Sequence, residues 1–202
     1  MLHTTDAIVL ALQPQSDKAH LLHAYTRTGG RVNYKVYGLG KHHSAGIYTP
    51  FSLIQITATH TPNRIPSVRE AVPMSKEQRA ISNQIYKQTV SLFLSEVLFR
   101  TLRHPMPDEH LFDFLENAVN HLASIDEQDQ EEIANFHIVF LVSLAAKLGF
   151  AIDENQHPEL LCLPQTRAER QQQLLRLCNY FAEHVETWQH PKSLDVLTEI
   201  FD

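Results

Sequence analysis

TGGRVNYKV, residues 28–36, is the stretch that decides the first half of the fold. Gly29 and Gly30 can supply the positive φ angles of a tight hairpin turn. A strict alternation of apolar and polar residues follows the glycines. Successive side chains of a β-strand point to opposite faces, so Val32, Tyr34 and Val36 share one face and the polar residues between them share the other. The stretch therefore predicts a hairpin and a strand with one apolar and one largely cationic face.

Four further segments of the first 74 residues are typical of short strands, because their apolar runs are bounded by turn-forming residues. The segment 51–59 places Ile54 and Ile56 on one face and Phe51 and Leu53 on the other. Five short strands are what a small Greek-key barrel requires. An OB-fold is the commonest five-stranded form, and an SH3-like barrel fits the count almost as well. The strands are expected at 7–12, 19–26, 31–36, 51–59 and 65–72.

From residue 75 the apolar period becomes helical. The segment 75–78 has the spacing of a capping box, and the helix that it opens is expected to end at about Arg103. Asp108 is expected to cap a second helix, and the acidic segment 126–132 to open a third. That third helix is apolar on nearly every side from 136 to 148, so we expect it to be covered all round at the centre of a bundle. A loop over 150–166 and two further helices are expected to follow.

Charge is divided unevenly along the chain. The net charge is −6, yet residues 1–80 contain nine Lys/Arg and only four Asp/Glu. Residues 81–202 contain eight Lys/Arg and nineteen Asp/Glu. A polyanion responds to charge within a Debye length of ~8–10 Å, so the basic half favours a nucleic-acid partner. In that mode cations contact phosphates and aromatic rings stack on bases. The candidate residues are Arg27, Arg31, Lys35, Lys41, His42, His43, Arg64 and Arg69, interleaved with Tyr25, Tyr34, Tyr37 and Tyr48.

The alternative interpretation of these residues is a set of solvated barrel cations and packed tyrosines. Tyr34 in particular shares a face with Val32 and Val36, which places it in a core. In the helical half, Arg100 and Arg103 are the first candidates for a partner-binding rim. Ordinary surface charge is an equally good interpretation of each of them.

No motif nominates an enzyme, a cofactor or a metal site. The chain contains no Gly-x-Ser-x-Gly elbow, no phosphate-binding loop and no His-Glu-x-x-His helix. His20 and His23 lie three apart on an expected strand and point to opposite faces, so they cannot chelate one ion. No catalytic residue is assigned, although an enzyme whose groups meet only in space stays an open alternative.

The two cysteines, Cys162 and Cys178, exclude a disulfide framework and suit a reducing cytoplasm. The N-terminus lacks the basic region and cleavage pattern of a signal peptide. The longest apolar stretch, 138–146, falls far short of the ~20 residues that span a bilayer. A cytoplasmic protein without a membrane partner is therefore expected.

Several short segments occur in a set order over nearly the whole chain. The barrel half contains Thr5-x-Ala7-Ile8-Val9-Leu10, His20-Leu21-Leu22, Thr26-x-x-Gly29, Val36-x-Gly38 with a loop containing Lys41, and Pro50-Phe51. The helical half contains Ser95-Glu96-Val97-Leu98, Leu111-Phe112-x-x-Leu115, Leu148-Gly149-Phe150 and Lys192-Ser193-Leu194. Each alone is ordinary core patterning. Together, in this order and spacing, they resemble the bacterial RecO family of recombination mediators.

The resemblance implies an α+β multidomain protein, with an OB-fold-like barrel over residues 1–74 and an all-helical partner-binding domain over 75–202. It further implies a non-enzymatic DNA repair protein that binds single- and double-stranded DNA and promotes strand annealing. With RecR, such a protein loads the recombinase onto DNA coated by single-stranded-DNA-binding protein, whose C-terminal tail it contacts. The expected location is the bacterial cytoplasm, associated with the nucleoid.

Two features depart from the family pattern. Many relatives carry four zinc-binding cysteines after the Leu-Gly-Phe segment, and two cysteines cannot supply four thiolates, so no structural zinc is expected. The loop after the third strand is often rich in Lys/Arg, whereas here it reads Gly-Lys-His-His-Ser. Fewer fixed charges release fewer counterions, which favours weak and pH-dependent DNA binding. A protein-interaction scaffold that has lost DNA binding is therefore the alternative function.

Overall fold

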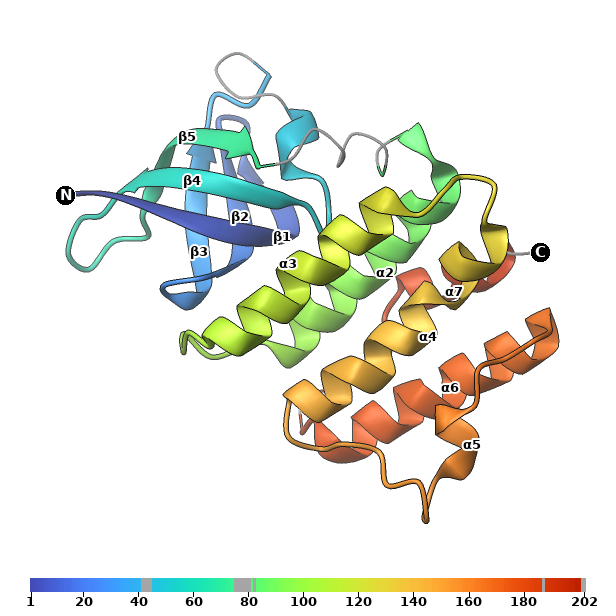
Figure 1. The fold of residues 1–202 in the computed structure, drawn as a ribbon. Coiled ribbons are helices and arrows are strands. Elements are labelled where there is room, and N and C mark those ends of the chain that lie inside the picture. The colour runs from blue at the N-terminus through green and yellow to red at the C-terminus, as the bar shows by residue number, and fades with distance from the viewer. Residues whose placement is uncertain (41–44, 75–80, 82, 187, 201–202) are drawn as a thin grey trace.

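The computed structural model describes residues 1–40, 45–74, 81, 83–186 and 188–200, and it combines a closed five-stranded barrel with a set of packed helices (Figure 1). The strands are β1 (Leu2–Ser16), β2 (Ala19–Thr26), β3 (Gly30–Tyr37), β4 (Leu53–Thr59) and β5 (Ser67–Pro73), with a 3-10 turn, η1 (Ala45–Tyr48), before β4. The helices are α2 (Ile85–Thr101), α3 (Glu109–Ser124), α4 (Gln130–Lys147), α5 (Pro158–Leu161), α6 (Arg167–His184) and α7 (Ser193–Ile200).

The strand order identifies the barrel as an OB-fold rather than an SH3-like barrel. The order is β1-β2-β3-β5-β4, closed by the antiparallel pairing of β1 with β4. β3 meets β5 in parallel, at Lys35 and Ser67. All five expected strands are confirmed, but β1 is much longer than expected. It pairs with β4 through its first half and with β2 through its second half, and a register shift between Val9 and Ala11 lies in the second half.

The hairpin between β2 and β3 uses its two glycines differently from the expectation. Only Gly30 has a positive φ, of 61°. Gly29 instead donates its backbone N–H to Thr26 Oγ1 at 3.1 Å. The positive-φ assignment is therefore correct for one glycine and wrong for the other, because a side-chain hydrogen bond supplies part of the turn.

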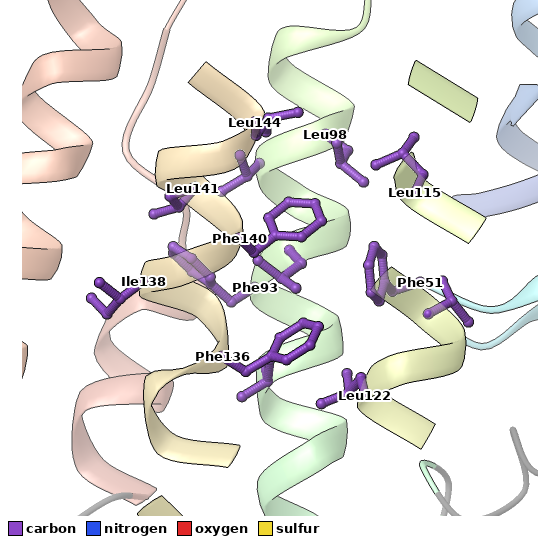
Figure 2. Close-up of a cluster of buried hydrophobic side chains, with 14 of the residues drawn as sticks. Phe51, Phe93, Leu98, Leu115, Leu122, Phe136, Ile138, Phe140, Leu141 and Leu144 are labelled. Atoms are coloured by element: carbon purple, nitrogen blue, oxygen red, sulfur yellow. The ribbon is translucent and has the colours of Figure 1, made fainter. Parts of the chain in front are cut away.

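Parts of the barrel strands are buried on both sides, as in the middle of β1 and at the start of β4. The side chains that fill the barrel interior include Val36, Ile54 and Ile56. Phe51 and Leu53 point the other way and join the hydrophobic core of the helices, which confirms the expected alternation. Figure 2 shows Phe51 among side chains from the helices, and its ring meets that of Phe140 edge-on with centroids 5.6 Å apart. The outer apolar face of the barrel thus belongs to the core of the helices, while the barrel interior is a second core. The division at residue 74 stays a prediction.

The first helix is not continuous as expected, because Gln84 is extended, with φ −120° and ψ 118°, and α2 begins after it and ends at Thr101 rather than at about Arg103. Other expected helix ends are confirmed. Asp108 accepts a hydrogen bond from the backbone N–H of Leu111 at 3.0 Å, so it caps α3. Gly149 follows α4 with a φ of +90°. The expected loop over 150–166 contains the short helix α5, which begins at Pro158. The predicted capping box at 75–78 lies outside the described residues.

The expectation that the third helix is covered on all sides is wrong on one side. This helix, α4, packs against α2, α3 and α6. Val139 is nevertheless 52% exposed, while its neighbours Ile138 and Phe140 are buried. Sequence periodicity shows that a helix lacks a polar face, but it does not show whether enough neighbours exist to cover every side.

A buried cation joins α2 to the end of α3. The side chain of Lys87 is buried, and its Nζ donates hydrogen bonds to the carbonyl oxygens of Ala123 at 3.2 Å and Ile125 at 2.6 Å. Carbonyls at a helix C-terminus have no partner within the helix and carry partial negative charge, so a cation there is stabilising.

Replacing Lys87 with methionine is expected to lower the free energy of unfolding by about 2 kcal/mol, because it leaves two carbonyls unpaired at similar volume. Urea denaturation followed by circular dichroism measures this. Lys147 is the matched control, since it is exposed in the last turn of α4 and its replacement by methionine should have little effect. Equal stability of K87M and wild type would show that the two hydrogen bonds contribute nothing.

Two of the segments that carry the family resemblance meet in space. Glu96 of α2 accepts hydrogen bonds from the backbone N–H groups of Lys192 and Ser193, each at 2.9 Å, and from Ser193 Oγ at 2.8 Å. Arg100 also pairs with it. Burial acts to raise the pKa of Glu96, but these hydrogen bonds outweigh burial and lower the pKa. Glu96 thus caps α7 from a residue 97 positions earlier.

Replacing Glu96 with glutamine is expected to cost about 2 kcal/mol of folding stability at neutral pH, because charge-assisted hydrogen bonds become neutral ones or are lost. A carboxyl whose pKa is lowered in the folded state stabilises the fold above its ordinary pKa, and this contribution disappears as the pH falls through the folded value. Denaturation of wild type and E96Q should therefore differ at neutral pH and converge in acid. Glu186→Gln, at an exposed position, is the control. A difference that persists unchanged in acid would contradict the assigned role of the charge.

Candidate nucleic-acid interface

Three of the candidate cations line one groove on the outside of the barrel. Lys35 comes from β3, Arg64 from the loop between β4 and β5, and Arg69 from β5. The groove has a volume of about 480 Å³. None of the other residues that line the groove is acidic. They are Tyr37, Thr59, Thr61, Asn63, Ile65 and Ser67. We call this surface the cationic groove.

The pairing of β3 with β5 brings these cations together. The backbone N–H of Lys35 donates to the carbonyl oxygen of Pro66 at 2.8 Å, which places the β4–β5 loop beside β3. The pairing of β4 with β5 shifts register next to Arg69, so this residue is the extra one of a bulge. Its Nε donates to Thr59 Oγ1 at 2.7 Å, which holds the guanidinium at the groove. Within the described part of the chain its other N–H groups make no further hydrogen bond, so they can contact an anion.

An exposed aromatic ring stands beside the cations. Tyr37, at the end of β3, is 48% exposed and lines the cationic groove. Tyr25, Tyr34 and Tyr48 are buried instead, and burial raises the pKa of Tyr34 and of Tyr48 to about 12. Of the four tyrosines suggested for stacking, Tyr37 is therefore the one whose ring a base can reach.

Arg27 lies at the contact between barrel and helices rather than at the groove. Its guanidinium pairs with Asp113 at 2.7 Å and Glu116 at 2.6 Å, both on α3, and lies 4.4 Å from the ring centroid of Phe112. The opposite charges sit well within a Debye length and neutralise it locally. We leave Arg27 out of the proposed binding surface.

Arg31 is held in a similar way at the end of α2. Its Nη1 donates to the carbonyl oxygens of Phe99 at 3.4 Å and Leu102 at 3.3 Å, and its guanidinium lies over the Phe99 ring. Burial, with a smaller contribution from Arg103, lowers the pKa of Arg31 to about 10. Like Arg27, it connects the two halves of the protein, and we leave it out of the binding surface as well.

The remaining candidate binding residues lie either outside the described residues or in the helical half. Lys41, His42 and His43 lie outside the described residues. Arg100 has a side chain only 11% exposed, pairs with Glu96 and donates to Gln189 Oε1 at 3.1 Å. Arg103 is exposed and donates from Nε to the carbonyl oxygen of Arg100 at 3.0 Å. Partner binding by these two arginines stays a prediction, and Arg100 already has its charge paired.

No group of three or more His, Cys, Asp or Glu side chains that could hold a metal ion occurs within the described ranges. Cys162 is exposed and Cys178 is buried in α6. Burial raises the pKa of Cys178 to about 12, so its thiol stays protonated and inert near neutral pH. No helix among the described residues is long and apolar enough to cross a membrane.

Sequence analysis missed the polar residues that complete the groove. Thr59, Thr61 and Asn63 contribute to its lining, and Asn63 has a positive φ of 59°. The sequence Thr61-Pro62-Asn63 predicted a turn, but it did not predict which face of the barrel the loop would lie against. Knowledge that an OB-fold binds its ligands with strands 2 and 3 and the β4–β5 loop would have selected this loop.

Comparison with known proteins identifies the family of the chain. Residues 82–189 match the family model described as Recombination protein O C terminal. The DNA repair protein RecO of Flavobacterium johnsoniae is 27% identical, with 98% of each chain covered. That of Porphyromonas gingivalis is 31% identical over 76% of this chain and 63% of its own, and that of Phocaeicola vulgatus is 26% identical over the whole of both. The chain therefore belongs to the RecO family of DNA repair and recombination proteins.

Proposed function

We propose that this protein is a recombination mediator that holds a nucleic-acid backbone in the cationic groove without catalysing a reaction. The observation that carries the proposal is the convergence of Lys35, Arg64 and Arg69 around one hollow beside the exposed ring of Tyr37. Cations that track phosphates next to a ring that stacks on a base are the features of sequence-tolerant single-strand binding. Membership of the RecO family supports the same function.

We extend the proposal to the activities that the family resemblance implies, and membership of the family supports them. They comprise binding of single- and double-stranded DNA, strand annealing and, with RecR, recombinase loading onto DNA coated by single-stranded-DNA-binding protein. The location proposed with these activities is the bacterial cytoplasm, associated with the nucleoid. A mediator needs to hold and release strands, so modest affinity from a few exposed cations is compatible with this work.

The second candidate function is a protein-interaction scaffold with weak or lost DNA binding. One observation favours it: Arg27 and Arg31, two of the eight candidate cations, have their guanidinium groups held by the helices and are only partly exposed. The two functions differ in how binding responds to salt, because only phosphate contacts release counterions.

Fluorescence anisotropy with a labelled single-stranded oligonucleotide across a salt series tests the proposal. Three phosphate contacts predict a slope of about −2 for the logarithm of the association constant against the logarithm of salt concentration. The full-length protein should therefore bind at low salt and release the oligonucleotide as salt rises. Absence of binding at low salt, or an affinity indifferent to salt, would favour the scaffold.

A further inference from the structure

A second groove lies between α3 and α4, on the helical half. Its volume is about 690 Å³, within the range of sites that bind ligands or peptide side chains. Phe114, Phe136, Val139 and Leu163 contribute to its apolar wall. Asp129, Glu131 and Glu132 also line it, from the start of α4. We call this surface the acidic groove.

The apolar wall is preformed and partly open to solvent. The rings of Phe114 and Phe136 each stack on Phe140, with centroids 5.2 Å and 6.4 Å away. Figure 2 shows Phe136 and Phe140 side by side on α4. Val139 is 52% exposed and Leu163 is 50% exposed. From the sequence we expected this side of α4 to be covered by other parts of the protein. Exposed apolar surface of this kind marks interaction sites.

The charged residues that α3 and α4 contribute to the groove are acidic, and the nearby Arg170 of α6 donates to Asn135 Oδ1 at 2.8 Å and interacts with Glu131. Residues 104–146, which include all of α3 and nearly all of α4, contain no Lys or Arg. Glu131 is exposed at the groove, and Glu132 pairs with the imidazole of His121 at 3.2 Å. Asp129 uses one carboxylate oxygen to cap α4 through the backbone N–H of Glu132. Three carboxylates thus surround the opening, with a histidine as the one basic side chain among the residues that line it.

We propose that the acidic groove binds a segment of another protein that carries aromatic or aliphatic anchors next to Lys or Arg. The anchors fill the wall at Val139 and Leu163, and the cations meet Glu131 and Glu132. An amphipathic helix or an extended segment can present both kinds of side chain on one face. An acidic tail does not fit here, because like charges brought together at an interface are strongly unfavourable. The acidic groove is separate from the cationic groove and does not depend on its function.

Selection from a random peptide library tests the proposal on the full-length protein. Val139→Lys is the blocking variant: it places a long cation in the groove at an exposed helical position, where lysine is well tolerated. Peptides are selected on wild type and counter-selected on V139K. The proposal expects the groove-dependent peptides to combine net positive charge with aromatic or aliphatic anchors.

A synthetic copy of one selected peptide then measures the contribution of the acidic residues by calorimetry. The double variant Glu131→Gln/Glu132→Gln should weaken binding about tenfold, since each exposed ion pair contributes modestly. Glu183→Gln/Glu186→Gln removes the same charge at exposed positions in and just after α6 and should leave binding unchanged. Circular dichroism and oligonucleotide binding of V139K should match wild type, which separates a blocked groove from a misfolded protein.

Three outcomes would overturn the proposal. The first is a set of groove-dependent peptides with net negative charge, and the second is the absence of groove-dependent peptides. The third is self-association of wild type that V139K abolishes in analytical ultracentrifugation, because the occupant would then be a second copy of this chain.

Discussion

Replacing Gly30 with alanine is expected to lower the free energy of unfolding by roughly 3–5 kcal/mol, among the largest effects of a single methyl group. Gly30 has a φ of +61°, which disfavours any residue with a Cβ by about 1 kcal/mol. A Cβ at this position would also lie 2.5 Å from the carbonyl carbon of Met106 and closer still to its oxygen. Backbone atoms cannot rotate away as a side chain can, so the contact between the barrel and the α2–α3 connection must open.

Gly149 provides the matched control for this prediction. Its φ is +90°, yet a Cβ there would meet no atom within 4 Å. G149A therefore reports the conformational penalty alone, about 1 kcal/mol, and G30A reports the penalty plus the clash. Asparagine tolerates positive φ, so it should recover part of the loss at 149 but not at 30. Urea denaturation of the four variants measures these differences. Similar losses for G30A and G149A would mean that the close approach to Met106 is not maintained in solution.

Local patterns were enough to predict the strands and their faces. The alternation placed Tyr34 in a core and put Ile54 and Leu53 on opposite faces of β4, because a two-residue period fixes relative orientation. The structure shows that Ile54 faces the barrel interior and Leu53 the helices. The order of the strands did not follow from these patterns. It depends on the parallel contact between Lys35 and Ser67, two residues far apart in the chain whose pairing leaves no local signal.

The outer face of β3 shows why the candidate site could be predicted only in part. Arg31 and Lys35 share that face and look alike in sequence, yet one contacts α2 and the other lines the cationic groove. A polar residue on the outside of a strand can face solvent or another part of the protein equally well. For Arg27 the deciding partners, Asp113 and Glu116, lie 86 and 89 residues later. Such distant ion pairs have no counterpart in local spacing.

Removing the three cations of the groove is the second large expected effect. In the variant Lys35→Ala/Arg64→Ala/Arg69→Ala, affinity for single-stranded DNA at about 50 mM salt should fall roughly 500-fold, since each phosphate contact contributes about eightfold there. The slope against salt should decrease by about 2 at the same time. Arg64 and Arg69 are exposed and Lys35 is half-buried, so the barrel should keep its fold. Anisotropy with the labelled oligonucleotide measures both quantities.

A control variant of the same net charge shows whether binding depends on where the cations lie. The control variant Lys147→Ala/Arg176→Ala/Lys192→Ala removes the same three charges at exposed positions of the helical half. A non-specific attraction to the whole molecule would be weakened equally by both variants, because each makes the net charge three units more negative. Binding in the groove predicts that only the barrel variant loses affinity, since Lys147, Arg176 and Lys192 are absent from its lining. Equal losses in the two variants would mean that the phosphate chain follows the overall field and not the groove.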